Sequence, residues 1–382
     1  MKTYKIAVLP GDGIGREVIE EAIRVLEAVQ EKVNGISLKL ERYECGARFW
    51  LENNKEYELS PEAFEFCKNE ADAIFFGAVG WTDENGKTVS YSDGRMVGID
   101  TLFKLRFELD LYANIRPTKL FEGVPHQISG KIKQIWKPEN VDFVTIRENT
   151  EDLYANMHGY LRRKEETEVA TDIMIATRKG VERIVKYAFE YCKSRNKGAP
   201  KDKQLRVSCV DKENVLASSK LFRSIFREIS SNYPAINSNY YYVDAFTLLM
   251  MQNPENLDVV VSQNMFGDII TDLAALLQGG MGMAPSGEIG EKNALFEPVH
   301  GSAPSIADKK IANPIAAILT ADLMLKWLAD KRNDKNLDVA ANLVESAVIS
   351  VLKDGKIRTQ DLGGNSRTDE MTDAILSFIK EE

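Results

Sequence analysis

The sequence predicts an α/β protein with two domains. Short apolar runs bounded by glycine or proline alternate along the chain with amphipathic stretches of helical spacing. This alternation is typical of a sheet covered by helices. The chain has 382 residues, of which 44% are hydrophobic, and this is enough for two hydrophobic cores.

In the first third, the strand-like run IAVLP leads into an expected helix over 17–33. The run LKLERYE, a helix near 61–69 and the apolar run AIFFGAV follow. After the polar, glycine-dotted segment 81–98, the stretch IDTLFKLRFELDLYANIRP predicts a helix followed by a strand.

The middle third has the pattern of its own α/β unit. It contains the expected strand VDFVTIREN, a charged hairpin over 161–174 and a helix over 179–193. The strand LRVSCV, a helix over 217–229 and the strands YYYVDAF and LDVVV come next. The last stretch, 336–382, predicts two helices around the glycine-rich turn DLGGN and shows no chemical signal.

Charge and composition exclude several classes of function. The net charge of −9 argues against a nucleic-acid partner and against a polybasic membrane contact. No apolar run approaches the roughly 18 residues of a membrane helix, and the first residues lack a signal-peptide pattern. The four cysteines are scattered without metal-binding spacing. We therefore expect a cytoplasmic protein.

A glycine-rich turn, PGDGIG, spans Pro10 to Gly15 between an expected strand and helix. It matches neither the GxGxxG of a Rossmann fold nor a P-loop. Two interpretations stay open, which are an anion site at the helix N-terminus and a merely tight turn.

Two aspartates follow the buried-looking strand LDVVV. Asp268 and Asp272 are four residues apart and would share one face of a helix. Their mutual repulsion suggests Mg²⁺ or Mn²⁺ between them, because these ions prefer oxygen ligands. The alternative is a solvated acidic helix face.

Other candidate groups lie at the ends of expected elements. Three arginines, Arg106, Arg116 and Arg147, would suit a small polyanionic acid if they converge, since guanidinium binds carboxylate in bidentate fashion. Singly, they would be exposed and paired with Glu108 or Glu148. A second set of candidates, at strand ends or able to transfer protons, comprises Tyr154, Lys212 and Asp244, and the alternative is a surface lysine and a core-edge tyrosine. The small-residue loop LFEPVHGSAPS could wrap an adenosine, with His300 and Asn313 as adenine contacts.

Together these motifs resemble the β-decarboxylating dehydrogenase family, which contains isocitrate, homoisocitrate, 3-isopropylmalate and tartrate/D-malate dehydrogenases. The resemblance runs from Gly11 to about Gly364. It implies a two-domain isopropylmalate/isocitrate dehydrogenase-like fold, not a classical Rossmann fold. A discontinuous large domain, 1–111 with 279–382, would bind the cofactor. The middle domain, 112–278, would carry the metal ligands and a clasp that joins a homodimer.

The resemblance also implies a role for each candidate residue. The arginines would hold the carboxylates of a 2-hydroxy diacid, Lys212 would be or relay to the general base, and Tyr154 would protonate the enol left by CO₂. Asp244, Asp268 and Asp272 would ligate the metal, with Lys212 and Asp244 entering from a second subunit. The implied cofactor positions are Asn214, Glu297, His300, Gly301, Ser302, Ala303, Ser305 and Asn313.

Two departures from the family pattern bear on specificity. NAD-dependent members usually carry an aspartate where this chain has Ser305, and NADP members carry Tyr and Arg where it has Gln360 and Gly364. We expect NAD, with NADP as the alternative. Where bacterial isocitrate enzymes have Ser and Asn, this chain has Asp100 and Leu102.

The apolar Leu102 resembles the isopropylmalate pattern, and the run LFKLRFELDLYANIRPTKLFEGVP resembles tartrate/D-malate enzymes. We expect 3-isopropylmalate or D-malate/tartrate as substrate, ahead of isocitrate and homoisocitrate. A non-catalytic regulatory subunit is the rival from another class, although such chains typically lose the Tyr, Lys or Asp positions that are present here. A phosphate-binding transferase that uses the glycine turn is a second rival.

Overall fold

The computed structural model describes residues 2–128, 130–164 and 166–381. The α/β prediction is confirmed. The chain divides into two compact units. The first unit contains Met1–Leu111, Leu120–Lys137 and Ala275–Glu382, and the second contains Tyr112–Lys119 and Pro138–Ala274. Residues 120–137 and 275–278, which are expected in the middle domain, thus belong to the first unit.

In the first unit, a mainly parallel sheet has the strand order β13-β14-β3-β1-β2. β13 pairs antiparallel with β14, and the other neighbours pair in parallel. The strands are β1 (Lys2–Leu9), β2 (Ile36–Arg42), β3 (Ala73–Phe76), β13 (Pro285–Ile289) and β14 (Ala294–Pro298). A separate hairpin joins β5 (His126–Ile128) to β6 (Lys131–Lys133).

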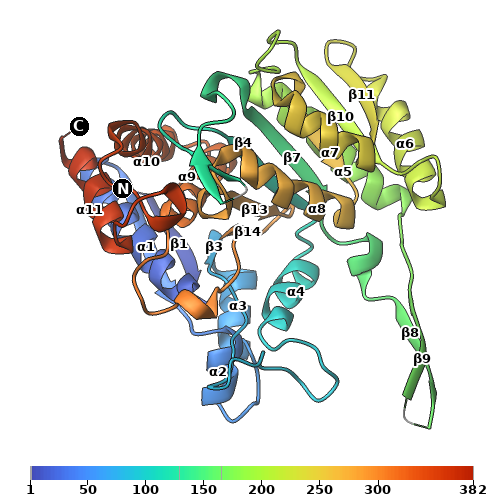
Figure 1. Cartoon of the computed structure of the whole chain (residues 1–382), viewed down its shortest axis with the longest axis horizontal. Coiled ribbons are helices and arrows are strands. Elements are labelled where there is room, and N and C mark those ends of the chain that lie inside the picture. Colours follow the sequence, from blue (N-terminus) through green and yellow to red (C-terminus); the bar gives the residue numbers. More distant parts are fainter. Residues whose placement is uncertain (1, 129, 165, 382) are drawn as a thin grey trace. The chain divides into compact units, whose positions relative to one another are not determined.

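The helices of the first unit are α1 (Ile14–Lys32), α2 (Gly46–Glu52), α3 (Pro61–Asn69), α4 (Ile99–Glu108), α9 (Ile315–Arg332), α10 (Lys335–Asp354) and α11 (Thr368–Glu381). α9 is buried along most of its length and contacts β13, β14, α1 and α10. α1 also contacts α11, so the first and last helices of the chain lie side by side (Figure 1). Short 3₁₀ turns are η4 (Leu276–Gln278), η5 (Met281–Met283), η6 (Pro304–Ile306) and η7 (Gln360–Leu362).

In the second unit, the strands have the order β11-β10-β12-β7-β4. β4 runs antiparallel to β7, and the remaining pairs are parallel. The strands are β4 (Ala113–Lys119), β7 (Asp142–Glu148), β10 (Arg206–Asp211), β11 (Asn237–Tyr242) and β12 (Val259–Ser262). The helices are α5 (Arg178–Arg195), α6 (Ala217–Ser230), α7 (Val243–Gln252) and α8 (Asn264–Ala275), with 3₁₀ turns η1 (Pro138–Asn140), η2 (Asp152–Ala155) and η3 (Pro254–Asn256).

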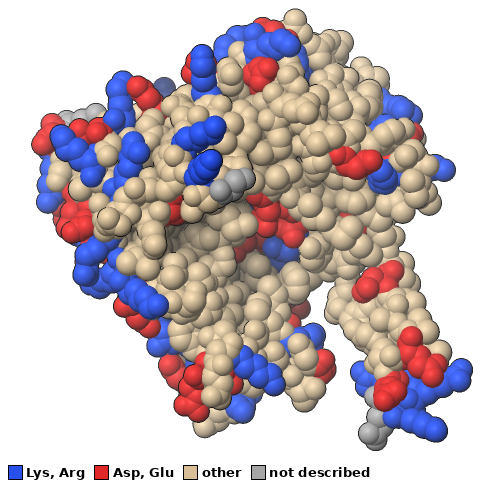
Figure 2. All heavy atoms as spheres, in the orientation of Figure 1, with Lys and Arg blue, Asp and Glu red and all other residues tan. Residues whose placement is uncertain are grey.

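A long hairpin of β8 (His158–Arg163) and β9 (Glu166–Asp172) extends from the body of the second unit (Figure 1). Every residue of β9 is exposed, and so are the apolar side chains of Leu161 and Val169. Lysine and arginine side chains gather near the tip of the hairpin (Figure 2).

One predicted strand is partly wrong. The run YYYVDAF was expected to be a strand throughout, but β11 ends at Tyr242 and α7 begins at Val243. The change of element places Asp244 in the first turn of a helix. Among the described residues, no helix is long and apolar enough to cross a membrane.

Candidate active site

Helix α8 presents the two predicted aspartates on one face. It starts directly after β12, and the backbone N–H of Met265 in its first turn donates to the carboxylate of Asp152 over 2.8 Å. This contact satisfies one of the amides that a helix N-terminus leaves unpaired. Asp268 and Asp272 then lie one turn apart, with about a third and a half of their side chains exposed.

Two of the three predicted arginines converge on this face. Arg116 and Arg147 come from the neighbouring antiparallel strands β4 and β7. Arg147 forms an ion pair with Asp268, and Arg116 reaches Asp272 over 3.3 Å. Both guanidinium groups are nearly buried. The alternative of exposed arginines is therefore wrong for these two residues.

The neighbours of the arginines hold their orientation. Arg147 donates through Nε and Nη2 to the side-chain oxygen of Asn264, over 2.9 and 2.7 Å. Arg116 donates to Thr271 over 2.7 Å. Gly267 allows this packing, because a Cβ atom at that position would lie 2.6 Å from Cγ of Arg147. The roles of Asn264, Thr271 and Gly267 are not predictable from the sequence, since only their place in the fold reveals them.

Tyr154 joins the same cluster. Its hydroxyl donates to Asp268 over 3.0 Å, and Arg147 lies over its ring at 5.4 Å from the centroid. Burial raises the pKa of Asp272, Arg116 opposes this rise, and the charge of Asp268 adds to it. A cation bound between the two carboxylates would relieve their repulsion.

Lys212 and Asp244 form a separate pair. Lys212 follows β10 directly, and its ammonium lies 2.6 Å from the carboxylate of Asp244. The hydrogen bond from Lys212 lowers the pKa of Asp244, whose side chain is 68% exposed. Among the described residues, no group of three or more His, Cys, Asp or Glu could hold a metal ion. Within one chain, the structure therefore brings Asp268 and Asp272 together but does not add Asp244.

Arg106 and Leu102 belong to the first unit, on α4. Arg106 is 4% exposed and forms a bidentate pair with Glu288, through Nε over 3.1 Å and Nη2 over 2.5 Å. Leu102 is partly buried and packs against a hydrophobic cluster of the first unit. At the start of the same helix, Asp100 pairs with Arg95 over 2.8 Å.

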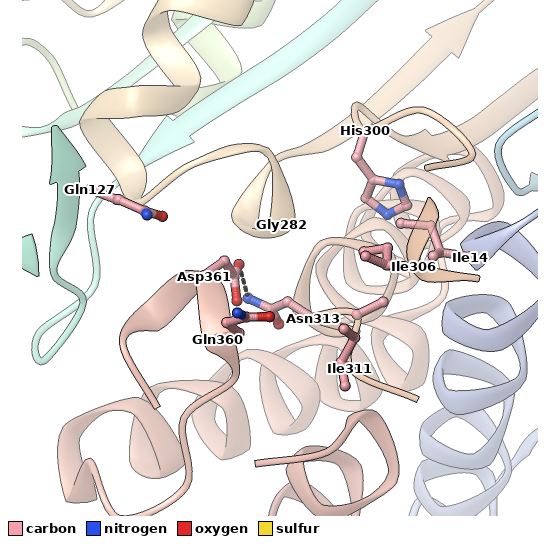
Figure 3. A pocket seen from close by; sticks show the side chains of 10 residues that line it. Ile14, Gln127, Gly282, His300, Ile306, Ile311, Asn313, Gln360 and Asp361 are labelled. Atoms are coloured by element: carbon pink, nitrogen blue, oxygen red, sulfur yellow. Dashed lines mark hydrogen bonds between the residues drawn. The ribbon is translucent and has the colours of Figure 1, made fainter. Parts of the chain in front are cut away.

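The loop predicted to wrap an adenosine borders a cavity of about 330 Å³ in the first unit (Figure 3). His300 lies on one side, and Ile14, Ile306 and Ile311 supply an apolar wall. Nε2 of His300 is buried and has no hydrogen-bond partner among the described residues. Burial lowers the pKa of His300, which favours a neutral imidazole. A base with complementary polar atoms would satisfy this nitrogen.

Asn313 is held in place at the other side of the cavity. Its side-chain oxygen accepts from the N–H of Ile315, and its amide nitrogen donates to Asp361, each over 3.0 Å (Figure 3). Asp361 and Gln360 line the cavity from η7. The turn DLGGN, for which no chemical role is expected from the sequence, is thus returned by the fold to the cavity.

The remaining predicted cofactor positions are spread over several elements. Ser302 is buried and Gly301 exposed in the loop after β14, and Glu297 lies within that strand. Ala303 has a left-handed backbone, with φ of 38°, and Ser305 is exposed on η6. Asn214 belongs to the second unit, where it is exposed in the turn after β10.

The glycine turn forms hydrogen bonds with other segments of the protein. The N–H of Asp12 donates to the carbonyl of Ala78 over 2.7 Å, and the N–H of Ile14 donates to the carbonyl of Ser302 over 2.9 Å. The buried carboxylate of Asp12 accepts three backbone amides from neighbouring segments. The amides of Asp12 and Ile14 are therefore engaged within the fold, which favours the interpretation of a tight turn.

Comparison with known proteins agrees with this geometry. The model of the family described as isocitrate/isopropylmalate dehydrogenase matches residues 5–375. A 3-isopropylmalate/3-methylmalate dehydrogenase of Methanocaldococcus jannaschii is 40% identical, over 99% of this chain and 100% of its own. A D-malate dehydrogenase (decarboxylating) of Escherichia coli is 37% identical, over 99% of both chains.

A solved structure is similar throughout. Isocitrate dehydrogenase from Methylococcus capsulatus superposes with a TM-score of 0.82 at 36% identity, and the match covers 99% of each chain. Similarity over the whole length therefore accompanies the convergence of Tyr154, Arg116 and Arg147 on the aspartates of α8. The chain belongs to the isocitrate/isopropylmalate dehydrogenase family.

Proposed function

We propose that this protein catalyses the metal-dependent oxidative decarboxylation of a 3-substituted malate, with NAD as the hydride acceptor. The observation that carries the proposal is the cluster on α8, where Asp268 forms an ion pair with Arg147 and accepts a hydrogen bond from the Tyr154 hydroxyl. Cations that recognise carboxylates, carboxylates that suit a divalent metal and a proton donor thus lie within one site.

In the proposed reaction, Arg116 and Arg147 bind the carboxylates of the substrate. Lys212 accepts the proton of the C2 hydroxyl while the hydride leaves C2. The bond between C3 and its carboxyl group then breaks, CO₂ departs, and the electron pair of that bond forms the enolate. Tyr154 returns a proton to C3, which gives the 2-oxo acid.

The residues present fit a divalent metal and a nicotinamide dinucleotide. Asp268 and Asp272 offer hard oxygen ligands, and a bound Mg²⁺ or Mn²⁺ would polarise the C2 oxygen. The unpartnered nitrogen of His300 fits an adenine in the cavity. The described residues that line the cavity include Asp361 and no lysine or arginine, which favours NAD over the 2′-phosphate of NADP.

For the substrate, we propose 3-isopropylmalate or D-malate/tartrate. Support comes from Leu102, which places an apolar side chain where isocitrate enzymes of the bacterial kind have asparagine. Isocitrate and homoisocitrate are therefore the alternatives. A regulatory subunit is disfavoured, because Tyr154, Lys212 and the three aspartates are all present.

We propose that the enzyme is a homodimer with shared active sites. A two-stranded hairpin is marginally stable alone, yet β8–β9 is exposed on both strands and carries apolar side chains such as Tyr160 and Leu161. Lys212 and Asp244, which are separate from Asp268 in one chain, would complete the site of the partner. Light scattering on the protein as it elutes from a size-exclusion column tests this proposal, and a monomer at assay concentration would contradict it.

We also propose a cytoplasmic location. The four buried cysteines form no disulfide, which suits the reducing cytoplasm.

Absorbance at 340 nm tests the proposed reaction. The panel pairs 3-isopropylmalate, D-malate, tartrate, isocitrate and homoisocitrate with NAD or NADP, each with and without Mn²⁺. We expect a metal-dependent signal with NAD and one of the first three acids. If no substrate of the panel raises the absorbance at 340 nm, although a folded dimer and bound Mn²⁺ are verified, the result would favour the regulatory subunit instead.

A further inference from the structure

We propose that Arg223 is a positioning residue. It holds the turn that carries Lys212 and the end of the strand that leads to Asp244 in a fixed position relative to each other. The proposal rests on the proposed function of Lys212 as the base. Arg223 lies on α6, and its guanidinium group is almost fully buried.

The guanidinium of Arg223 contacts the residues on both sides of Lys212. Nε and Nη2 donate to the two oxygens of Asp211 over 2.8 and 2.7 Å, and Asp211 is completely buried. Nη1 donates to Glu213 over 3.0 Å. The turn that carries Lys212 is therefore held by its two neighbours, while the ammonium of Lys212 points to another partner, Asp244.

The same guanidinium also reaches the next strand. Nη2 donates to the backbone carbonyl of Tyr241 over 3.1 Å, three residues before Asp244. The guanidinium carbon also lies over the rings of Tyr240 and Tyr242, at 5.6 and 5.1 Å from their centroids. Arg223 thus connects the end of β10, where Lys212 begins, with the end of β11, where α7 and Asp244 begin.

Only a planar fork with several donors makes these contacts at once, and a lysine ammonium at the same place could not. In a single chain, the side chain of Asp244 is 68% exposed and that of Lys212 is 25% exposed. Arg223 holds both residues from the buried side, through the ends of β10 and β11. A displacement of about 1 Å at a reacting group can lower a rate about 100-fold.

The first test compares R223K and R223Q with R227Q. Arg227 lies one turn further along α6, is 54% exposed and contacts the same Glu213 at 3.4 Å, so R227Q is a matched control. We expect R223K to fold and dimerise, to lower kcat about 10- to 100-fold and to leave the KM for NAD unchanged. R227Q should stay within about twofold of the parent enzyme. If R223Q fails to fold, the kcat values of R223K and E213Q decide whether the proposal holds.

The second test is a double-mutant cycle with K212A, whose residual rate is measured at high enzyme concentration. A positioning role predicts that R223K lowers the rate less once Lys212 is absent, because only its effect on Asp244 then remains. An equal loss in both backgrounds would show a general structural role and overturn the proposal. Parent-like kcat in folded R223K would also overturn it. Full activity of K212A would instead refute the proposed function of Lys212 itself.

Discussion

The hydroxyl group of Tyr154 donates a hydrogen bond to the same carboxylate, Asp268, that forms an ion pair with Arg147. Asp268, a candidate metal ligand, is therefore in direct contact with both a proton donor and a carboxylate-binding cation. This arrangement can orient the tyrosine hydroxyl before any ligand arrives, so its role can be separated from binding.

We predict that Y154F lowers the overall rate by about 100-fold or more, because positioned acids contribute roughly 10²–10⁴ to catalysis. The KM for NAD and the metal requirement should change little. NADH formation and release of CO₂ from labelled substrate measure the effect. Y233F is the control, since Tyr233 has an exposed hydroxyl that contacts Glu190. A rate of Y154F equal to that of Y233F would exclude Tyr154 as the proton donor.

The half-exposed Asp272 gives a prediction about the metal. D272N should raise the Mn²⁺ concentration needed for half-maximal activity about tenfold or more, since a charged oxygen ligand is lost. Thermal stability should hold, because the change removes a partly exposed pair with Arg116. Activity titrated with Mn²⁺ measures the shift, and D354N, at the exposed end of α10, is the control. An unchanged titration curve would remove Asp272 from the metal site.

Regular elements with clear periodicity could be predicted from the sequence. The helix over 61–69 was predicted with the residues that α3 has, and its Ser60 cap and Pro61 supply the start signal. α9 was not predicted, because it is buried along most of its length and so lacks an apolar stripe. The alternation of polar and apolar residues is informative only where an element faces water.

The candidate site could be predicted residue by residue, but its partners could not. Asp268 and Arg147 carry chemical side chains at the ends of elements, which sequence patterns reveal. Gly267 and Asp361 became visible only when the fold brought distant segments together. In the proposed homodimer, Asp244 would join the other aspartates only through a second chain, and no pattern within one chain decides this.

Gly282 yields a prediction about the cofactor cavity. A Cβ atom at this position would lie 2.5 Å from a carboxylate oxygen of Asp361 and 3.2 Å from the amide nitrogen of Asn313. G282A should therefore disturb their hydrogen bond and raise the KM for NAD severalfold, while the KM for the diacid stays constant. Initial rates at varied NAD measure this. An equal rise in both KM values would point to a general distortion of the fold.

Glu148 lies at the end of β7 and is almost completely buried. Its carboxylate accepts the backbone amides of Thr150 and Glu151, over 2.9 and 2.8 Å. Burial nevertheless raises its pKa to about 7, from a usual value of 4.5. The folded chain thus binds this proton more tightly than the unfolded chain does. The resulting stabilisation is complete below about pH 4.5 and is lost as the pH rises through 7.

We predict that E148Q flattens the dependence of unfolding free energy on pH. Between pH 5 and pH 8, the parent protein should lose up to about 3 kcal/mol more than the variant, at 1.36 kcal/mol for each pKa unit. Urea unfolding at a series of pH values measures the difference, whatever the absolute cost of the substitution. For E139Q, at an exposed position on η1, the plot of unfolding free energy against pH should run parallel to that of the parent protein. Parallel curves for E148Q as well would mean that the carboxyl group of Glu148 is ionised throughout this range.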